Sequence, residues 1–309
     1  MKKVLVTGGT GFIGSRLVSY LLSKSIKVIV IDKSILKPTY FDISKAEIIE
    51  GDVLSQGLLR ECLKRVDTCF HLAAILSLTV CARDWIFSHE NNVLAFNGLL
   101  EELRRAAHPV KLVYASSCAV YGDSQDLPSS ELHRVNPISS YGADKLSNEI
   151  YAEVVAKSYG VNAIGLRLFN VYGPGQLDSN SYAGVITSFK NAIDKGQPIR
   201  IFGDGNQTRD FIYLEDVVEG FVAVANNKSI KSGIYNICNG NPISILDLAE
   251  LMMKLSGKRV SIIHENARPG DPYHSLGDSS LAKEKFGFCA KISMESGLKN
   301  LFTINKGHS

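Results

Sequence analysis

The sequence has no long uninterrupted hydrophobic run and no block of like charges. Its longest apolar stretch, 70–82, is interrupted by His71, Ser77 and Thr79, and it falls short of the ~20 residues that a membrane helix needs. Only three apolar residues separate the opening Met1-Lys2-Lys3 from the glycine-containing segment that follows, too few for a secretory leader. The formal net charge of +3 over 309 residues is too small to indicate nucleic-acid binding. We therefore expect a cytoplasmic protein that binds neither nucleic acid nor membrane.

Several motifs of other enzyme classes are also missing. The six cysteines contain no C-x-x-C pair, and in a chain of this length they indicate reduced thiols. The seven histidines form no H-E-x-x-H or comparable cluster, so we expect no metal site. No G-x-S-x-G segment of a serine hydrolase is present. The composition, 45% hydrophobic and 21% charged, is that of a globular protein with one large domain or two modest ones.

Short β-branched runs alternate with helical patterns in the first half of the chain. The patterns predict strands at 3–7, 27–31, 48–50, 68–72, 110–115 and 163–168, and helices at 12–23, 93–107 and 141–159. Short, fully apolar strands separated by helices predict an α/β fold with a doubly wound parallel sheet. The second half is richer in turns, with helix-capping signals at Asp216 with Glu219 and at Ser244 with Asp247.

A glycine-rich loop connects the first strand to the first helix. Residues 7–14 read TGGTGFIG, with Gly8, Gly11 and Gly14 three apart. Glycines allow the backbone to approach a pyrophosphate closely, and the helix N-terminus supplies N–H donors to the anion. The strand–loop–helix context favours dinucleotide binding over a glycine turn without a ligand.

Acidic residues follow the second and third strands. Asp32 lies eighteen residues after Gly14, where a carboxylate can accept the ribose hydroxyls and repel a 2′-phosphate, which favours NAD over NADP. The adjacent Lys33 leaves some room for NADP. Asp52, in the turn Gly51-Asp52-Val53, could reach the adenine edge, although its spacing fits an ordinary turn equally well.

Tyr141 and Lys145 occupy positions i and i+4 of a predicted helix and share one face. An unperturbed tyrosine has a pKa of ~10. A neighbouring ammonium and a positive nicotinamide ring favour the phenolate, which would lower that pKa and make a base. Such a pair is more often found on a solvated face, but the upstream dinucleotide loop and Ser116-Ser117 at a strand end favour catalysis.

These residues resemble the extended short-chain dehydrogenase/reductases. The motifs that carry the resemblance are TGGTGFIG, His71-Leu72-Ala73-Ala74, Ser116-Ser117, Tyr141-x-x-x-Lys145 and Arg167-Leu-Phe-Asn170. Two C-terminal segments, IFGDGNQTRDFIYLEDV (201–217) and RPGDPYHSLGD (268–278), narrow it to NAD-dependent nucleotide-sugar epimerases and dehydratases, nearest to the UDP-hexose 4-epimerases.

The resemblance spans nearly the whole chain and implies its organisation. It implies an NAD-binding Rossmann domain at 1–170, to which 203–235 returns, and an interleaved nucleotide-sugar-binding domain at 171–309. It also implies a homodimer joined through the helices near 93–107 and 141–159.

The resemblance also implies residue roles. Ser117 would bind the sugar 4-hydroxyl, Tyr141 would be the base and Lys145 would bind the nicotinamide ribose. The implied cofactor residues are Gly8, Gly11, Phe12, Ile13, Gly14, Asp32, Lys33, Asp52, Val53, Leu72, Ala73, Ala74, Asn91, Tyr141, Lys145 and Phe169. The implied UDP-sugar residues are Ser117, Asn170, Gly184, Val185, Phe202, Arg209, Arg268 and Ser275, of which the two arginines suit a diphosphate.

The residues after Ser117 bear on the reaction. Dehydratases of the family place an acid pair here, whereas this chain has Cys118 and Ala119. Ala119 has no proton to give, and we expect Cys118 to be an inert core thiol. Elimination is therefore disfavoured, and the resemblance implies 4-epimerisation with retained NAD, by transient oxidation at C4 through a 4-keto sugar. A one-way 4-ketoreductase with an exchangeable cofactor and a non-catalytic NAD sensor are the alternatives.

The substrate is predicted from one position. Alignment on Gly270-Asp271 places Ser275 beside the sugar C2 substituent, where a small residue leaves room for an N-acetyl group. This favours UDP-GlcNAc and UDP-GalNAc, with UDP-Glc and UDP-Gal as second substrates, although a loop serine without a steric role fits equally well. Asp144 and Thr187 depart from the usual serine and proline of relatives, and UDP-glucuronate 4-epimerisation stays open.

Overall fold

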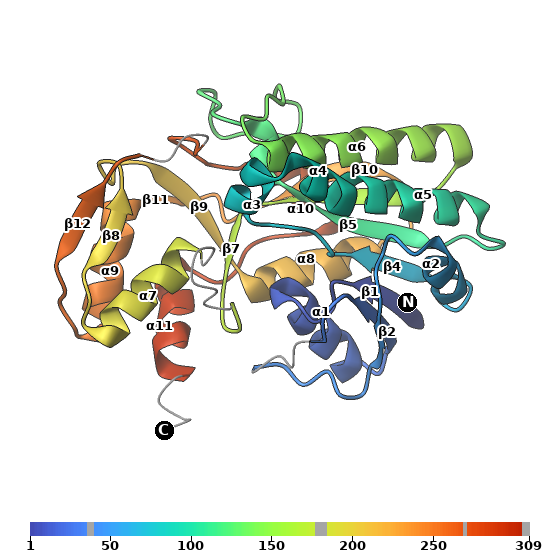
Figure 1. The fold of residues 1–309 in the computed structure, drawn as a ribbon, viewed down its shortest axis with the longest axis horizontal. Helices are drawn as coiled ribbons and strands as arrows, with labels where there is room; N and C mark the ends of the chain where they lie inside the picture. The colour runs from blue at the N-terminus through green and yellow to red at the C-terminus, as the bar shows by residue number, and fades with distance from the viewer. Residues whose placement is uncertain (36–39, 177–183, 268–270, 305–309) are drawn as a thin grey trace.

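The computed structural model describes residues 1–35, 40–176, 184–267 and 271–304. Its central feature is a seven-stranded, fully parallel sheet in the order β10-β6-β5-β4-β1-β2-β3 (Figure 1). The strands are β1 (Lys3–Thr7), β2 (Lys27–Asp32), β3 (Glu47–Glu50), β4 (Thr68–His71), β5 (Lys111–Ser117), β6 (Ala163–Leu168) and β10 (Gly233–Ile237). The predicted doubly wound sheet is confirmed. Its seventh strand, β10, comes from the second half of the chain.

Helices cover both faces of this sheet because the strands are apolar on both sides. On one face lie α1 (Phe12–Ser23) and α8 (Leu214–Asn226), whose Leu17 and Phe221 are fully buried against Val6 and Phe70. On the other lie α2 (Gln56–Leu63), α5 (Ala95–Arg105) and α6 (Ser140–Tyr159). The α6 helix begins at the cap Ser139, whose side chain accepts from the Gly142 N–H, and it ends at Gly160 in the left-handed conformation.

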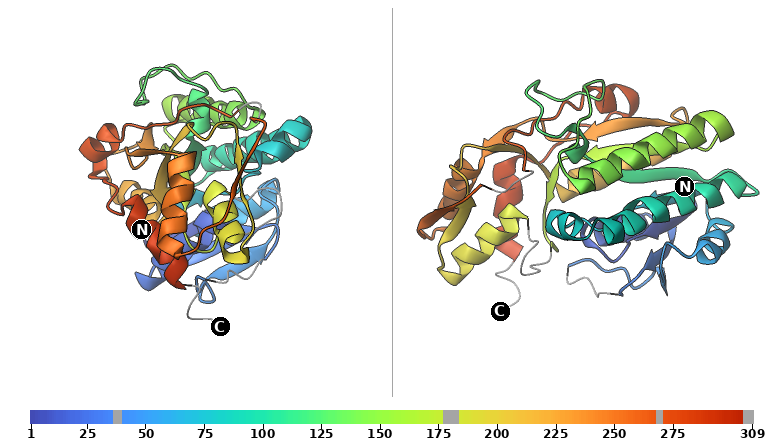
Figure 2. Two further views of the ribbon diagram at one scale, coloured as in Figure 1. Left: turned by 90° about the vertical axis from the view of Figure 1, so that its left-hand side faces the viewer. Right: turned by 45° about the horizontal axis from the view of Figure 1, so that its top comes forward.

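The second part of the chain forms a smaller lobe beside the strand ends of the large sheet (Figure 2). It holds two small sheets, β11-β9-β7 and β12-β8, flanked by helices around an apolar core of their own. The elements are β7 (Asn170–Tyr172), α7 (Val185–Lys195), β8 (Ile199–Phe202), β9 (Thr208–Tyr213), β11 (Pro242–Ser244), α9 (Ile245–Ser256), β12 (Ile262–Glu265) and α11 (Met294–Ile304).

The chain crosses between the two parts more than once. Residues 214–237 supply α8 and β10 to the large sheet, and α10 (Ser280–Phe286) packs near β10, with the Phe286 ring edge-on to Tyr235. These contacts support the interleaved division at 1–170, 203–235 and 171–309, which we keep as a proposal. In the structure the returning segment starts at Leu214, because β9 belongs to the small sheet.

Short helical segments lie near the carboxyl ends of the β4 and β5 strands. They are α3 (Leu78–Arg83), α4 (Trp85–His89), a π-helical turn (Glu90–Leu94) that runs into α5, and a 3-10 turn (Cys118–Tyr121) that follows β5. π-Helical turns are rare and often lie at functional sites.

Of the two predicted helix caps, one is confirmed and one is wrong. Ser244 caps α9 by accepting from the Asp247 N–H. Asp216 does not cap α8, which begins at Leu214 after Tyr213. The carboxylate of Asp216 instead accepts the backbone N–H groups of Lys291 and Ile292, each at 3.1 Å, a long-range partnership that sequence spacing does not reveal.

Candidate active site

Three cavities share lining residues between the large sheet and the smaller lobe. The sheet cavity, of about 490 Å³, lies over the strand ends. The middle cavity, of about 250 Å³, lies beside the turn after β5, and the outer cavity, of about 290 Å³, lies within the smaller lobe. Asn170, at the start of β7, lines all three. They therefore form a site suited to an elongated ligand.

The sheet cavity occupies the topological switch point of the large sheet. The chain reverses direction across the sheet between the adjacent strands β1 and β4, and ligands of doubly wound folds bind at the strand carboxyl ends beside this point. Every predicted cofactor residue except Asp52 lines the cavity: Gly8, Gly11, Phe12, Ile13, Gly14, Asp32, Lys33, Val53, Leu72, Ala73, Ala74, Asn91, Tyr141, Lys145 and Phe169.

The glycine positions of the loop each need a small residue, but for different structural reasons. A Cβ on Gly14 would lie 2.0 Å from the Gly8 carbonyl oxygen, and one on Gly8, whose φ is +69°, would lie 2.6 Å from the Ala73 nitrogen. Both are therefore required by packing within the protein. A Cβ on Gly11 would approach only the Gly8 oxygen, at 3.3 Å, so its small size serves chiefly to keep the cavity open.

The first turn of α1 is arranged for an anion. Its cap is Gly11, no side chain caps the helix, and the first turn holds no acidic residue. The unpaired N–H groups and the positive end of the helix dipole therefore face the cavity without competition from a carboxylate. The loop and helix fit a dinucleotide pyrophosphate.

The polar residues at the β2 end are tied together. The Asp32 carboxylate accepts from the Thr10 N–H at 3.0 Å and the Thr10 hydroxyl at 2.7 Å. The Lys33 ammonium lies 2.9 Å from an Asp52 carboxylate oxygen and donates to the Asn91 side-chain oxygen at 2.5 Å. Asp52 thus neutralises Lys33, and its neighbours Gly51 and Val53 line the cavity in its place.

Ser117, Tyr141 and Lys145 lie together where the strand ends meet α6. Ser117 and Tyr141 line both the sheet and the middle cavities, and the Tyr141 hydroxyl interacts with the Ser117 side chain. The Lys145 ammonium is 5.7 Å from the Tyr141 ring centre and donates to the Ala115 carbonyl at 2.9 Å. The three side chains can hold a hydroxyl and move a proton at the border of the two cavities.

Burial dominates the electrostatics of this group. It lowers the pKa of Lys145 to about 8, against the charge of Asp144, and it raises the pKa of Tyr141, against the hydrogen bond from Ser117. From the sequence, Lys145 and the nicotinamide ring are expected to lower the tyrosine pKa. In the chain alone desolvation is the larger effect, and the pKa of Tyr141 is raised.

Two neighbouring polar residues are structural. Ser116 lines the sheet cavity, but its hydroxyl donates to a Glu149 carboxylate oxygen of α6 at 2.5 Å, so the hydroxyl is held by a partner within the protein. The buried His71 lies 2.8 Å from the Thr7 hydroxyl, and burial lowers its pKa to about 3, which makes it neutral.

The middle cavity brings the turn after Ser117 against the segment 271–276. Cys118, Ala119 and Ser275 line it, and the Cys118 thiol interacts with the Ser275 side chain. Cys118 packs against the buried cluster of Val120, Tyr121, Phe169 and Cys238 while the 3-10 turn also presents it to the cavity, so it is partly rather than fully buried. Burial raises its pKa to about 11, so it carries no thiolate near neutral pH.

The outer cavity holds most of the remaining predicted substrate residues. Gly184, Val185, Phe202 and Arg209 line it, whereas Arg268 lies outside the described residues. The Arg209 guanidinium lines both the middle and outer cavities and lies 2.7 Å from an Asp271 carboxylate oxygen.

Some lining residues were not predicted. Gln176 lines the sheet and outer cavities, and its side chain accepts from the Thr187 hydroxyl at 2.9 Å. The threonine that replaces proline in α7 therefore has a defined partner. The sequence feature that could have pointed to Gln176 is the turn Gly173-Pro174-Gly175 directly before it. Leu76 lines the sheet and middle cavities. In the sequence it lies within an apolar run, and no turn or motif distinguishes it from its neighbours.

The described part of the chain offers neither a metal centre nor a membrane-spanning helix. It contains no group of three or more His, Cys, Asp or Glu residues placed to hold a metal ion. Within the same ranges no helix is long and apolar enough to cross a membrane. All six cysteines are free thiols.

Comparisons with known proteins find relatives that match nearly the whole chain. The model of the NAD dependent epimerase/dehydratase family matches residues 4–238. The chain is 34% identical over 308 residues to a putative UDP-glucose 4-epimerase of Methanocaldococcus jannaschii, with 99% of both chains covered. It is 33% identical over 307 residues to a UDP-glucose 4-epimerase of Mycolicibacterium smegmatis, with 96% of both covered.

Solved structures are similar over their full length. A UDP-glucose 4-epimerase of Thermotoga maritima with UDP-glucose has a TM-score of 0.92 at 31% identity, covering 99% of this chain and all of that one. A UDP-N-acetylglucosamine 4-epimerase of Methanobrevibacter ruminantium with UDP-N-acetylmuramic acid has a TM-score of 0.89 at 32% identity, with 99% of both covered. A UDP-glucuronic acid 4-epimerase of Bacillus cereus with UDP-glucuronic acid and NAD has a TM-score of 0.89 at 31% identity, covering 99% and 100%.

Proposed function

Since the chain belongs to the NAD-dependent epimerase/dehydratase family, we propose that it interconverts UDP-GlcNAc and UDP-GalNAc by inversion at C4, with UDP-Glc and UDP-Gal as second substrates. That it is an NAD-dependent enzyme of the UDP-sugar 4-epimerase kind follows from the family and the relatives. One observation carries the proposal. The Ser117–Tyr141 pair lies at the border of the sheet cavity, which the glycine loop lines, and the middle cavity, which reaches Ser275.

The residues divide the chemistry between them. Bound NAD would supply reversible hydride acceptance at the sugar C4. The Ser117 hydroxyl would orient the 4-hydroxyl, and the Tyr141 phenol oxygen would take its proton and later return it. The Lys145 ammonium, held by the Ala115 carbonyl, would stabilise the phenolate. In the turn after Ser117, Ala119 has no acid group and Cys118 remains a thiol, which disfavours elimination of water.

The lining of the middle cavity supports a neutral sugar. Arg209 is the one lysine or arginine among the described residues that line it, and Asp271 pairs with it. Because Arg209 also lines the outer cavity, we assign it to the diphosphate, with Gly184, Val185 and Phe202 around the nucleoside. Besides Arg209, His274 lines this cavity, with its Nδ1 2.9 Å from the Thr208 hydroxyl. A glucuronate carboxylate would thus find no unpaired lysine or arginine among the described lining residues, so we rank UDP-glucuronate below the neutral hexoses.

The test uses protein as purified, without added NAD. It is incubated separately with UDP-GlcNAc, UDP-Glc and UDP-glucuronate, and the products are resolved chromatographically. UDP-GalNAc formed without added cofactor supports the proposal, and Tyr141→Phe serves as the control, with turnover lower by at least about 100-fold. Turnover of UDP-Glc alone would refute the assignment of Ser275. A requirement for added NADH or NADPH and a keto sugar would instead indicate a reductase.

We also propose that the enzyme is a cytoplasmic homodimer. The six free thiols suit a reducing compartment. The α6 helix exposes an apolar face formed by Ile150, Tyr151 and Val154, which are 54%, 49% and 49% exposed, beside Leu94 of the π-helical turn at 56%. A second copy that packs the same helices against it would bury this face.

A further inference from the structure

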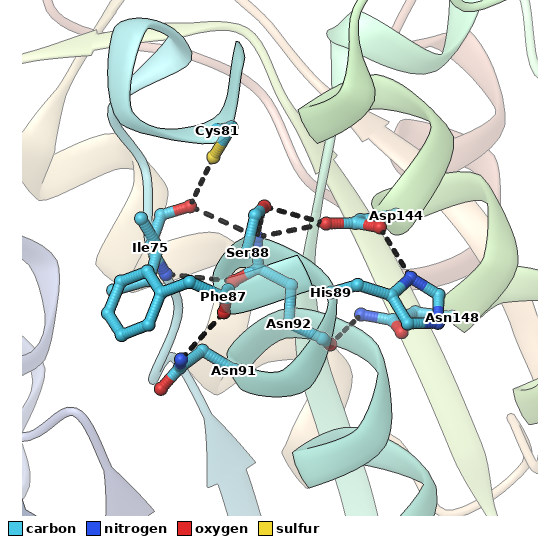
Figure 3. Close-up of polar contacts among 9 residues, drawn as sticks. All are labelled: Ile75, Cys81, Phe87, Ser88, His89, Asn91, Asn92, Asp144 and Asn148. Carbon is cyan, nitrogen blue, oxygen red and sulfur yellow. Dashed lines mark hydrogen bonds and ion pairs between the residues drawn. The ribbon is translucent and has the colours of Figure 1, made fainter. Parts of the chain in front are cut away.

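A buried polar network connects α6 to the segment before α5 (Figure 3). The Asp144 carboxylate, whose side chain is 8% exposed, accepts from the Ser88 hydroxyl at 2.9 Å and lies 3.0 Å from the His89 Nδ1 atom. The Asn92 amide nitrogen lies 3.4 Å from the same carboxylate and 3.3 Å from the Ser88 hydroxyl. A buried carboxylate is stable only when such donors satisfy it.

The same network reaches the wall of the sheet cavity. The Asn92 side chain binds both backbone groups of Ile75, accepting from its N–H at 2.8 Å and donating to its carbonyl at 3.2 Å. Ile75 lines the sheet cavity. From α6, the Asn148 amide donates to the Asn92 carbonyl at 3.0 Å. The position of this wall relative to the catalytic helix is therefore set by contacts made around Asp144.

Asp144 also directly precedes Lys145 in the chain, and Lys145 is almost fully buried at 3% exposure. The titratable groups of the packed elements that act on Lys145, besides Asp144, are Glu149 and Tyr141 of α6, Cys81 of α3 and His71 of β4. A buried ammonium keeps its proton only if an anion near it offsets the loss of water.

Most of these groups supply no net negative charge near neutral pH. Burial raises the pKa of Cys81 and of Tyr141 and lowers that of His71 to about 3, so all three are neutral. The charge of Glu149 is matched by a bidentate pair with Arg167 at 2.9 and 2.8 Å.

Asp144 differs from Glu149 in its partners. Ser88 and Asn92 are neutral, and the His89 side chain is 60% exposed, so water screens any charge that it carries. Among the groups that act on Lys145, Asp144 is therefore the anion whose charge no buried cation cancels.

We propose that Asp144 is a positioning residue of this site: its carboxylate holds the Ile75 wall against α6 through Ser88 and Asn92, and its charge keeps the neighbouring Lys145 protonated. This rests on the proposed function only for the role of Lys145 in turnover. The charge effect exists whatever the reaction is, so it can be measured separately.

The test compares Asp144→Asn with the wild type as purified. Lysines are labelled with ¹³C at Cε, the Lys145 signal is assigned by its loss in Lys145→Arg, and its shift is followed against pH. In Asp144→Asn the midpoint is expected to fall by roughly one pH unit below that of the wild type, because the negative charge of Asp144 favours the charged form of Lys145. The alkaline limb of kcat/KM moves down with it.

Matched variants separate charge from packing. Glu153→Gln removes an exposed acid of the same helix, paired with Lys157, and leaves the midpoint in place. Ser88→Ala removes a hydrogen bond of the network without removing charge, so it lowers NAD retention and leaves the midpoint in place. A wild-type midpoint in Asp144→Asn, or an equal shift in Ser88→Ala, overturns the proposal. If Asp144→Asn does not fold, Asp144→Ser is judged by the same criteria.

Discussion

The buried pair formed by Glu149 and Arg167 allows a quantitative test of what holds α6 in place. Both side chains are 6% exposed. Burial opposes the charge on Arg167, but the hydrogen bonds and charge of Glu149 outweigh it and raise the pKa of the guanidinium. Arg167 also donates to the Tyr121 hydroxyl at 2.8 Å, and Ser116 donates to Glu149. Removing either charged partner leaves the other as an uncompensated buried charge.

The perturbation is a double-mutant cycle of Glu149→Leu and Arg167→Met. Each single variant is expected to lose roughly 3–5 kcal/mol of unfolding free energy. Independent effects would add to roughly 6–10 kcal/mol in the double variant. Since the double variant buries no unpaired charge, we expect it to lose no more than the worse single variant, apart from about 1 kcal/mol for the one further hydroxyl that loses a partner.

The assay is urea unfolding followed by circular dichroism at fixed protein concentration. A loss of 3–5 kcal/mol lowers the midpoint by about 1–2 M when the urea dependence is about 3 kcal/mol per M. Glu153→Leu, which breaks the exposed pair with Lys157 on the same helix, serves as the control and should cost less than about 1 kcal/mol. Additive losses in the double variant, or single losses as small as the control, would refute the reasoning.

Three further predictions concern the cofactor, the sugar and the assembly. Gly11→Val places a side chain in the open part of the sheet cavity, so we expect near wild-type thermal stability but an NAD content, measured by absorbance after extraction, at least about tenfold lower; full retention would contradict the cofactor assignment. Ser275→Tyr fills the middle cavity beside Cys118, so turnover of UDP-GlcNAc should fall while that of UDP-Glc persists, and unchanged N-acetylated turnover would exclude the steric role. Val154→Glu places a charge on the exposed apolar face of α6 and should convert the proposed dimer to monomers in light-scattering chromatography, whereas a mass equal to wild type would contradict this interface.

The sequence by itself determined the elements whose information is local. The strand 3–7 and the helix 12–23 have the predicted bounds, because a run of β-branched residues and an apolar face repeating at helical spacing are visible in neighbouring residues. The spacing of Tyr141 and Lys145 likewise places both on one helix face before any fold is known. The glycine loop was recognisable because strand, turn and helix N-terminus are consecutive in the chain.

Only the tertiary structure decided the partners that come from distant segments. Cys118 and Ala119 meet Ser275 across more than 150 positions of the sequence, and Asp216 accepts from residues 291 and 292 rather than capping its own helix. The effect of Asp144 on Lys145 is local in the chain, but its partners Ser88 and Asn92 arrive from another helix. Burial, which raises the pKa of Tyr141 and lowers that of Lys145, depends on which segments cover the site, and a single stretch of sequence does not contain that information.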